Sequence, residues 1–208
     1  SLKNMNSCKF KNKTKFTKAY FPSLVNSKPV KNTYKLDKHL VITGPNAAGK
    51  TTLLKTTIFN IIISQQIGFG FYKKADIIPY DMIHCYINIP DTSARDSLFQ
   101  AEAKRCKDIL SQIDNNEMDK PDQFSKNLKH FCVFDELYSG TNPYEAISSA
   151  FSFLKYLNKT DNVNFVLTTH FLDLCRRLEK HQGINNYHMK IETINDDFNY
   201  TYKLEKGI

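Results

Sequence analysis

Apolar and polar residues follow two different patterns along this chain. Near both ends they alternate with a period of two, which is typical of short strands that expose one face to water. In the middle, short apolar runs are separated by longer segments of helical character. The alternating ends predict exposed strands over 7–21 and 33–36 and a closing hairpin over 187–193 and 198–204, whereas the apolar runs predict strands over 40–43, 82–87, 130–134 and 163–168.

The segments between the apolar runs predict helices. The first, Lys50 to about Gln66, is apolar on most sides and is therefore expected to be central. Further helices are predicted over 93–113, 144–158 and 171–180, while the polar, proline-bearing stretch 114–127 predicts an inserted loop. Strands that alternate with helices indicate a single α/β domain over 1–208, with a mainly parallel central sheet flanked by helices and antiparallel strands at both chain ends.

A glycine-rich segment joins the first apolar run to the central helix. It reads Gly-Pro-Asn-Ala-Ala-Gly-Lys-Thr and matches the phosphate-loop pattern G-x-x-x-x-G-K-[ST] in full. Such a loop points backbone N–H groups and a helix N-terminus at phosphate oxygens. Lys50 then supplies charge to the phosphates and the Thr51 hydroxyl can ligate Mg²⁺. The predicted nucleotide-binding residues are Gly44, Pro45, Asn46, Ala47, Ala48, Gly49, Lys50, Thr51 and Thr52.

Two later strands end in residues that suit hydrolysis. The run Phe131–Phe134 is followed by Asp135, which can reach Mg²⁺, and by Glu136, which can polarise an attacking water. The run 163–168 is followed closely by His170, which could donate to the γ-phosphate. Lys50, Glu136 and His170 are therefore the predicted catalytic residues, and the other five histidines are interpreted as structural.

Charge and cysteine usage add little to this picture. Residues 1–50 hold eleven lysines and one acid, whereas the rest of the chain sums to −2 of the total +8. A lysine strip can contact nucleic acid, but lysine alternating with polar residues is more typical of the solvated face of an edge strand. The five cysteines form no C-x-x-C pair, which favours reduced intracellular thiols. No apolar run is long enough to cross a bilayer, and no signal peptide is recognisable.

Four motifs taken together resemble the ATPase domain of the MutS family of DNA mismatch-repair proteins, which are relatives of ABC-type ATPases. They are LVITGPNAAGKTT at the phosphate loop, DSLFQAE at 96–102, DELYSGTN at 135–142 and TTHF at 168–171. The resemblance covers essentially the whole chain and implies an ABC-type P-loop fold, bound ATP and Mg²⁺, and ATP hydrolysis. Leu137-Tyr138-Ser139 stands where the main repair branch commonly has a Gly-Arg pair, which indicates a divergent branch.

The resemblance also implies a partner. Such domains dimerise, so Ser97 is expected to contact the γ-phosphate of the other subunit, and the turn 139–142 is expected to lie near the dimer interface. Asn46 is expected near the γ-phosphate of its own site. The adenine pocket is poorly marked, with Val30 as the candidate that packs on the base.

The expected function is therefore the ATP-hydrolysing motor of a larger MutS-like protein, working as a homo- or heterodimer inside the cell, in the cytoplasm or nucleus. Regions that precede this domain in the family would hold double-stranded DNA, and no membrane is involved. Two alternatives stay open. One is another ABC-type motor, such as an SMC-like protein or a transporter subunit, although no Leu-Ser-Gly-Gly signature occurs. The other is a nucleotide-gated scaffold without turnover, against which Glu136 argues.

Overall fold

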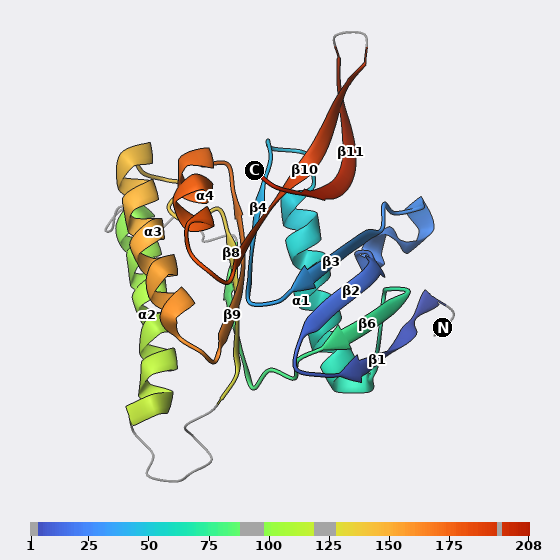
Figure 1. The fold of residues 1–208 in the computed structure, drawn as a ribbon, viewed down its shortest axis with the longest axis horizontal. Coiled ribbons are helices and arrows are strands. Elements are labelled where there is room, and N and C mark those ends of the chain that lie inside the picture. Colours follow the sequence, from blue (N-terminus) through green and yellow to red (C-terminus); the bar gives the residue numbers. More distant parts are fainter. Residues whose placement is uncertain (1–3, 88–97, 119–127, 195–196) are drawn as a thin grey trace.

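The computed structural model describes residues 4–87, 98–118, 128–194 and 197–208. These residues form two sheets that lie on either side of helix α1 (Lys50–Ile67) (Figure 1). The larger sheet has six strands in the order β11-β10-β4-β9-β8-β7, and the smaller has five in the order β3-β2-β6-β1-β5. The predicted α/β organisation is confirmed, and both sheets are mixed.

The larger sheet is mainly parallel, because its strands β10, β4, β9, β8 and β7 pair in parallel and only β10 and β11 pair antiparallel. Each strand of this sheet lies within two residues of its predicted bounds, except β10, which begins three residues early. The strands are β4 (His39–Thr43), β7 (Met82–Tyr86), β8 (His130–Asp135), β9 (Val163–Thr169), β10 (Ile184–Ile194) and β11 (Asp197–Lys206).

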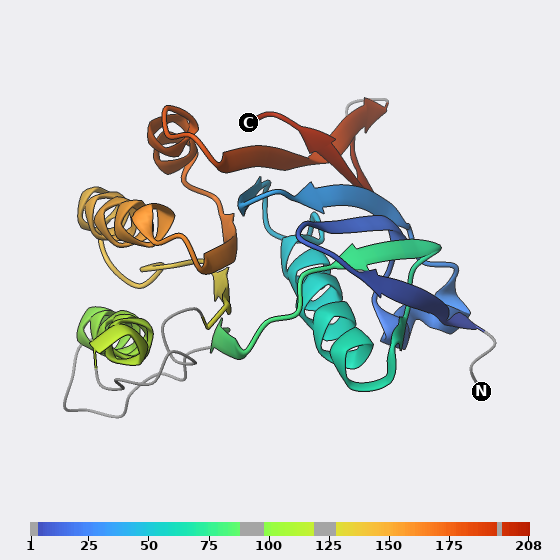
Figure 2. The ribbon, with the colours of Figure 1, turned by 60° about the horizontal axis from the view of Figure 1, so that its bottom comes forward.

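Both faces of this sheet are covered, which explains its uninterrupted apolar runs. Along β8, Phe131 and Val133 pack towards α1, whereas Cys132 and Phe134 pack towards the other helices. Those helices form a layer on the far side from α1 (Figure 2). They are α2 (Leu98–Met118), α3 (Pro143–Lys159) and α4 (Leu172–Glu179).

The smaller sheet shows that the prediction of exposed strands over 7–21 and 33–36 was partly wrong. The alternating residues there are not wholly exposed, because Phe16, Tyr34 and Leu36 are buried against α1. The sheet also contains two strands, β5 and β6, that were not predicted from the sequence, because they are only two and four residues long. Its strands are β1 (Asn6–Phe10), β2 (Thr14–Ala19), β3 (Asn32–Leu36), β5 (Phe69–Gly70) and β6 (Lys74–Ile77), and a short 3-10 helix (Pro22–Ser27) lies between β2 and β3.

The predicted inserted loop over 114–127 was partly wrong. Helix α2 continues to Met118, and its Asp114 carboxylate accepts a 2.9 Å hydrogen bond from Tyr156 on α3. This tertiary contact helps to hold polar residues that show no helical periodicity of their own. Residues 119–127 lie outside the described part of the chain, as do residues 93–97 at the predicted start of the helix.

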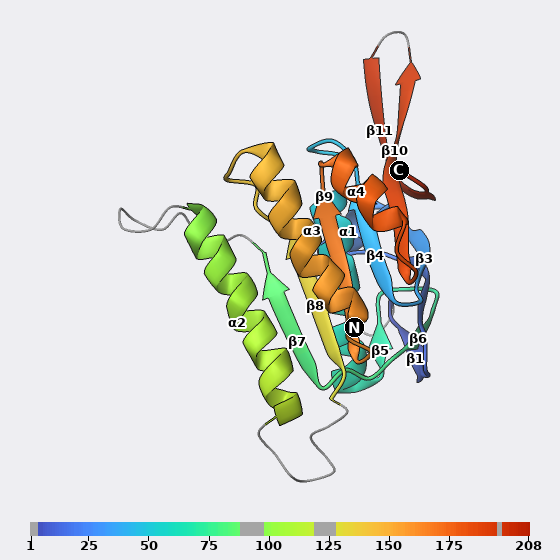
Figure 3. The ribbon, with the colours of Figure 1, turned by 60° about the vertical axis from the view of Figure 1, so that its left-hand side comes forward.

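The hairpin of β10 and β11 projects from the body of the protein (Figure 3). Its base is nonetheless tied to the smaller sheet, because Asn32 of β3 donates to the Tyr202 carbonyl and accepts from the Leu204 N–H. Among the described residues, no helix is long and apolar enough to span a membrane.

Candidate functional site

The predicted site residues meet at one edge of the larger sheet. Strands β4, β9 and β8 are neighbours and run in parallel, so their carboxyl ends lie together. Open α/β sheets bind ligands at this edge. The glycine loop follows β4, Asp135 ends β8, and His170 follows β9.

The loop between β4 and α1 curls back on itself through residues with positive φ. Ala47 has φ 67° and Gly49 has φ 93°. Gly49 also faces Tyr202 of β11, because a Cβ placed on it would lie 3.0 Å from the Tyr202 ring. Only glycine satisfies both the conformation and this close approach.

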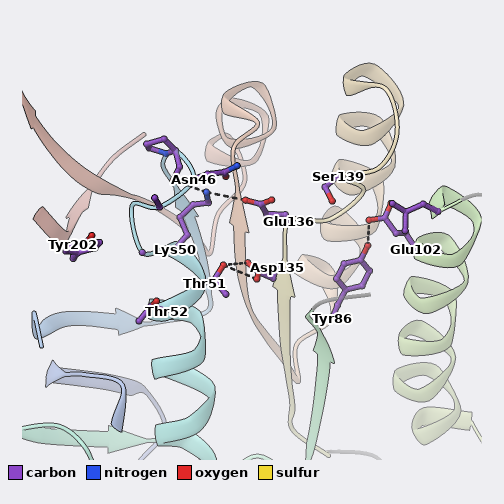
Figure 4. Close-up of a pocket in the computed structure, with 14 residues that line it drawn as sticks. Asn46, Lys50, Thr51, Thr52, Tyr86, Glu102, Asp135, Glu136, Ser139 and Tyr202 are labelled. Atoms are coloured by element: carbon purple, nitrogen blue, oxygen red, sulfur yellow. Dashed lines mark hydrogen bonds and ion pairs between the residues drawn. The ribbon is translucent and has the colours of Figure 1, made fainter. Parts of the chain in front are cut away.

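Lys50 is the first residue of α1 and is only 4% exposed. Its ammonium donates to the carbonyls of Gly44, at 2.8 Å, and Pro45, at 3.2 Å. It also forms an ion pair with Glu136 at 3.2 Å (Figure 4). The positive charge therefore lies inside the loop, where its counter-ion is a carboxylate that an anionic phosphate could replace.

Asp135 is the centre of a small hydroxyl network. Thr51 donates to its two carboxylate oxygens at 3.1 and 3.0 Å, and Thr168 of β9 donates to one of them. The described residues contain no group of three histidines, cysteines or acids that could hold a metal ion by themselves. The oxygens of Thr51 and Asp135 suit Mg²⁺, which typically takes one or two protein ligands and completes its shell with phosphate and water.

The turn after β8 places Glu136 between Lys50 and His170. The His170 ring nitrogen lies 4.0 Å from the Glu136 carboxylate, so the three predicted catalytic side chains are brought together. Glu136 and Tyr138 both have left-handed backbones, with φ 54° and 57°. Non-glycine residues in this region carry strain, which in folded proteins clusters at functional sites.

The residues on the opposite wall of the cleft were not predicted as site residues from the sequence. The cavity has a volume of about 560 Å³, and its far side is lined by Tyr86 of β7, Leu98 and Glu102 of α2, and Ser139 (Figure 4). Tyr86 donates to Glu102 at 2.7 Å, and burial together with this bond raises the pKa of Tyr86. The second oxygen of Glu102 is buried and has no hydrogen-bond partner in the described part of the chain.

A second cavity of about 400 Å³ adjoins the glycine loop. Gly49 and Thr52 line it at one end, and Val30, Phe21 and Tyr202 are among its apolar lining. Val30 is therefore beside the loop, as expected of a residue that packs on a base. Tyr202, which lines both cavities, was missed because it lies in the C-terminal hairpin, far along the chain from the loop.

Other predicted residues that the structure describes lie outside the cluster of Lys50, Glu136 and His170. Ala48 is buried under the loop and does not line the first cavity, whereas Asn46 does. Asn142 caps α3 by accepting from the N–H groups of Tyr144 and Glu145, each at 3.1 Å. Ser97 lies outside the described residues, so the contact expected of it in trans stays a prediction.

The histidines interpreted as structural include three that are buried in the larger sheet. His39 stacks on Phe165 at 4.0 Å between ring centres, and the ring nitrogens of His84 and His130 lie 2.9 Å apart. All five cysteines are free.

Comparison with known proteins supports the resemblance given by the motifs. The model of the family described as MutS domain V matches residues 40–208, which is most of the chain. The chain belongs to the MutS family. That match begins at β4, so β1, β2 and β3 precede it.

Named relatives agree with this assignment. The chain is 29% identical over 171 residues to the DNA mismatch repair protein MutS of Clostridium novyi (strain NT), which covers 81% of the chain and 17% of that protein. It is 28% identical over 193 residues to the proteins of the same name from Persephonella marina (strain DSM 14350 / EX-H1) and Aquifex pyrophilus. These matches cover 91% and 92% of the chain and 20% of each relative, so the chain spans about a fifth of their length.

Proposed function

We propose that this chain is the ATP-binding and ATP-hydrolysing motor of a MutS-like DNA mismatch-repair protein from a divergent branch, with an ABC-type P-loop fold. The observation that carries the proposal is the contact of Thr51 with both oxygens of Asp135, at 3.1 and 3.0 Å. It joins the phosphate loop to the end of β8 at the point where a nucleotide-bound Mg²⁺ would be held.

The ion pair of Lys50 with Glu136 suggests how binding prepares hydrolysis. When ATP enters the loop, its phosphate oxygens would compete for the Lys50 ammonium and release the Glu136 carboxylate. The freed carboxylate would accept a proton from the attacking water, while His170, beside it, would donate to the γ-phosphate. Mg²⁺ held by Thr51 and Asp135 would neutralise phosphate charge when bound.

The adenine ring would enter the cavity beside the loop. Its lining of Val30, Phe21 and Tyr202 offers apolar and aromatic surface of the kind on which a base packs. This placement connects the C-terminal hairpin to the nucleotide, because Tyr202 would contact the base and the phosphate loop at once.

The proposal includes a nucleotide-dependent dimer with composite sites. In a closed dimer, Ser97 would face the partner's γ-phosphate, and groups from both subunits would neutralise it. DNA recognition is proposed for the whole protein, because the relatives are named DNA mismatch repair proteins and the chain spans a fifth of them. No described contact favours an SMC-like or transporter motor instead.

Phosphate release with Mg²⁺ and ATP tests hydrolysis. Glu136→Gln removes the proton acceptor and should lower turnover about 100-fold or more, while ATP binding persists. The matched control is Glu179→Gln on the exposed face of α4, which should leave turnover unchanged. ATP binding without phosphate release, unaltered by Glu136→Gln, would instead support the scaffold without turnover.

Dimer formation needs its own measurement. Sedimentation of Glu136→Gln with Mg²⁺ and ATP should show a dimer that is absent with ADP, and the wild-type turnover per chain should rise with protein concentration. A monomer under all conditions, with turnover independent of concentration, would contradict the composite site.

A further inference from the structure

The outward face of the smaller sheet carries lysines that lie side by side in register. Lys15 of β2 pairs directly with Lys35 of β3 on one side and with Asp76 of β6 on the other. Lys9 of β1 also pairs with Asp76, and Lys74 precedes it by two residues on the same face. The row across the four strands is therefore Lys35, Lys15, Asp76 and Lys9, with Lys74 two residues along β6, and all four lysines are exposed.

This surface extends beyond the sheet. A groove of about 830 Å³ adds Lys11, Lys13 and the ring of Phe10, which is 52% exposed. A second groove of about 360 Å³ shares Lys15 and Lys35 with the first and reaches the end of β11. We name the combined surface the lysine face and define it by Lys9, Lys11, Lys13, Lys15, Lys35, Lys74 and Lys206.

Little negative charge balances the lysine face. Among the described residues that line the two grooves, the acids are Asp37 and Asp76, and Asp76 is already paired with Lys11 at 3.1 Å. Lys15 and Lys35 lie directly opposite each other, an arrangement of like charges that destabilises a sheet. A polyanion seated on this face would relieve that repulsion.

Protection of a sheet edge does not explain these positions. Lysines often lie on edge strands, where they discourage pairing with other chains. Lys35 fits this explanation because β3 is an edge strand, but Lys15 and Lys74 lie on β2 and β6, which are interior strands. If the face were only solvated, acidic residues at some of these lysine positions would form stabilising ion pairs between neighbouring strands.

We propose that the lysine face binds the phosphate backbone of double-stranded DNA. Lysines are point charges that suit phosphate oxygens, and the absence of arginine from this set disfavours reading of base edges. Binding would therefore be independent of sequence and strongly dependent on salt. The face shares no lining residue with the ATP cleft, so it would contact DNA whether or not that site is occupied.

Fluorescence anisotropy of a labelled 20-base-pair duplex tests the proposal with the 208-residue chain. The triple variant Lys13→Gln, Lys15→Gln, Lys35→Gln should bind at least about tenfold more weakly at 50 mM salt. The slope of log K against log salt should shrink by about 3, since each phosphate contact contributes about 0.9. Thermal unfolding should show that the triple variant is as stable as the wild type.

The matched control removes the same charge from the opposite side of the larger sheet. Lys104→Gln, Lys107→Gln, Lys159→Gln alters exposed residues of α2 and α3 and should keep the wild-type slope (Figure 2). Equal weakening by both triple variants, no binding by the wild type, or equal competition by polyglutamate or anionic vesicles of the same charge concentration would overturn the proposal. ATP turnover of the lysine variant should be unchanged, which separates this test from that of hydrolysis.

Discussion

The two sheets of this protein bury their side chains in different patterns. In the larger sheet, successive residues of β8 from His130 to Phe134 are all buried, because helices cover both faces. In the smaller sheet, burial alternates strictly along β3, where Tyr34 and Leu36 point to the core and Thr33 and Lys35 point to water.

This difference suits the two sheets to different kinds of binding site. The larger sheet brings Asp135, Glu136 and His170 together at its carboxyl edge, which is where the candidate ATP site lies. The smaller sheet has a whole face free for charge, on which the lysines gather. The changes below test the contrast in order of decreasing effect on the free energy of unfolding.

The largest effect is expected from Phe134→Ala. The Phe134 ring is fully buried and packs against Phe153 and Phe165, with ring centres 5.3 and 6.2 Å away. Truncation leaves a cavity and should lower the free energy of unfolding by about 3–5 kcal/mol, measured by urea denaturation. A loss below about 1 kcal/mol would show that the covered sheet is not closely packed at this point.

Acidification should reveal the buried histidines of the larger sheet. Burial lowers the pKa of His39 to about 3 and that of His130 to about 4, so both are neutral when folded and bind protons on unfolding below pH 6.5. Stability is therefore lost as pH falls from about 6.5 towards 4, by up to about 1.4 kcal/mol per pH unit for each histidine.

Urea denaturation at pH 7 and pH 5 measures this loss. His39→Gln retains a side-chain acceptor for the Phe165 N–H and should show a smaller difference between the two pH values than the wild type. Equal stability of the wild type at both pH values would contradict the assignment of these histidines as neutral.

A smaller effect is expected from Tyr86→Phe at the far wall of the cleft. The change removes the 2.7 Å hydrogen bond to Glu102 and leaves that buried carboxylate with less compensation, which should lower the free energy of unfolding by about 1–3 kcal/mol. In the double variant with Glu102→Leu the loss caused by Tyr86→Phe should largely disappear. Additive losses would mean that the two groups do not act as a pair.

The smallest effect is expected from Lys15→Gln on the smaller sheet. The side chain is exposed and faces Lys35, so its neutralisation should change the free energy of unfolding by less than about 0.5 kcal/mol, or raise it slightly. Thermal unfolding at low salt measures the change most sensitively, because salt screens the repulsion. A clear loss of stability would indicate that Lys15 has a structural role.

The fold was predictable where a short run of apolar residues identifies a buried strand. The runs at β4, β8 and β9 are continuous apolar segments, and a parallel strand covered on both faces has no other pattern. Strands β5 and β6 were not predictable, since they are two and four residues long and are held by pairing with β1 and β2. The last turn of α2 was missed because a contact with α3 stabilises it.

The candidate site also contains residues that could be predicted from the sequence and residues that could not. Lys50, Thr51, Asp135 and Glu136 were predictable because each follows a strand in a motif whose residue types match phosphate and Mg²⁺. Tyr86 carries no motif, and its role depends on Glu102, a residue that the DSLFQAE motif contained without a role. Tyr202 lies beside Gly49 because β11 pairs with β10 and is tied to β3, neither of which the residue types near Tyr202 reveal.

By itself, the sequence determined the glycine loop after β4, the acids at the end of β8 and the parallel core, because these depend on residue types at short spacing. Only the tertiary structure decided which residues complete the cleft, which cavity adjoins the loop and which lysines share a face. Such neighbours are set by strand order and register, and pairs like Asn32 with Tyr202 lie 170 residues apart along the chain. Spacing in the sequence cannot encode contacts that arise only when two sheets pack on one helix.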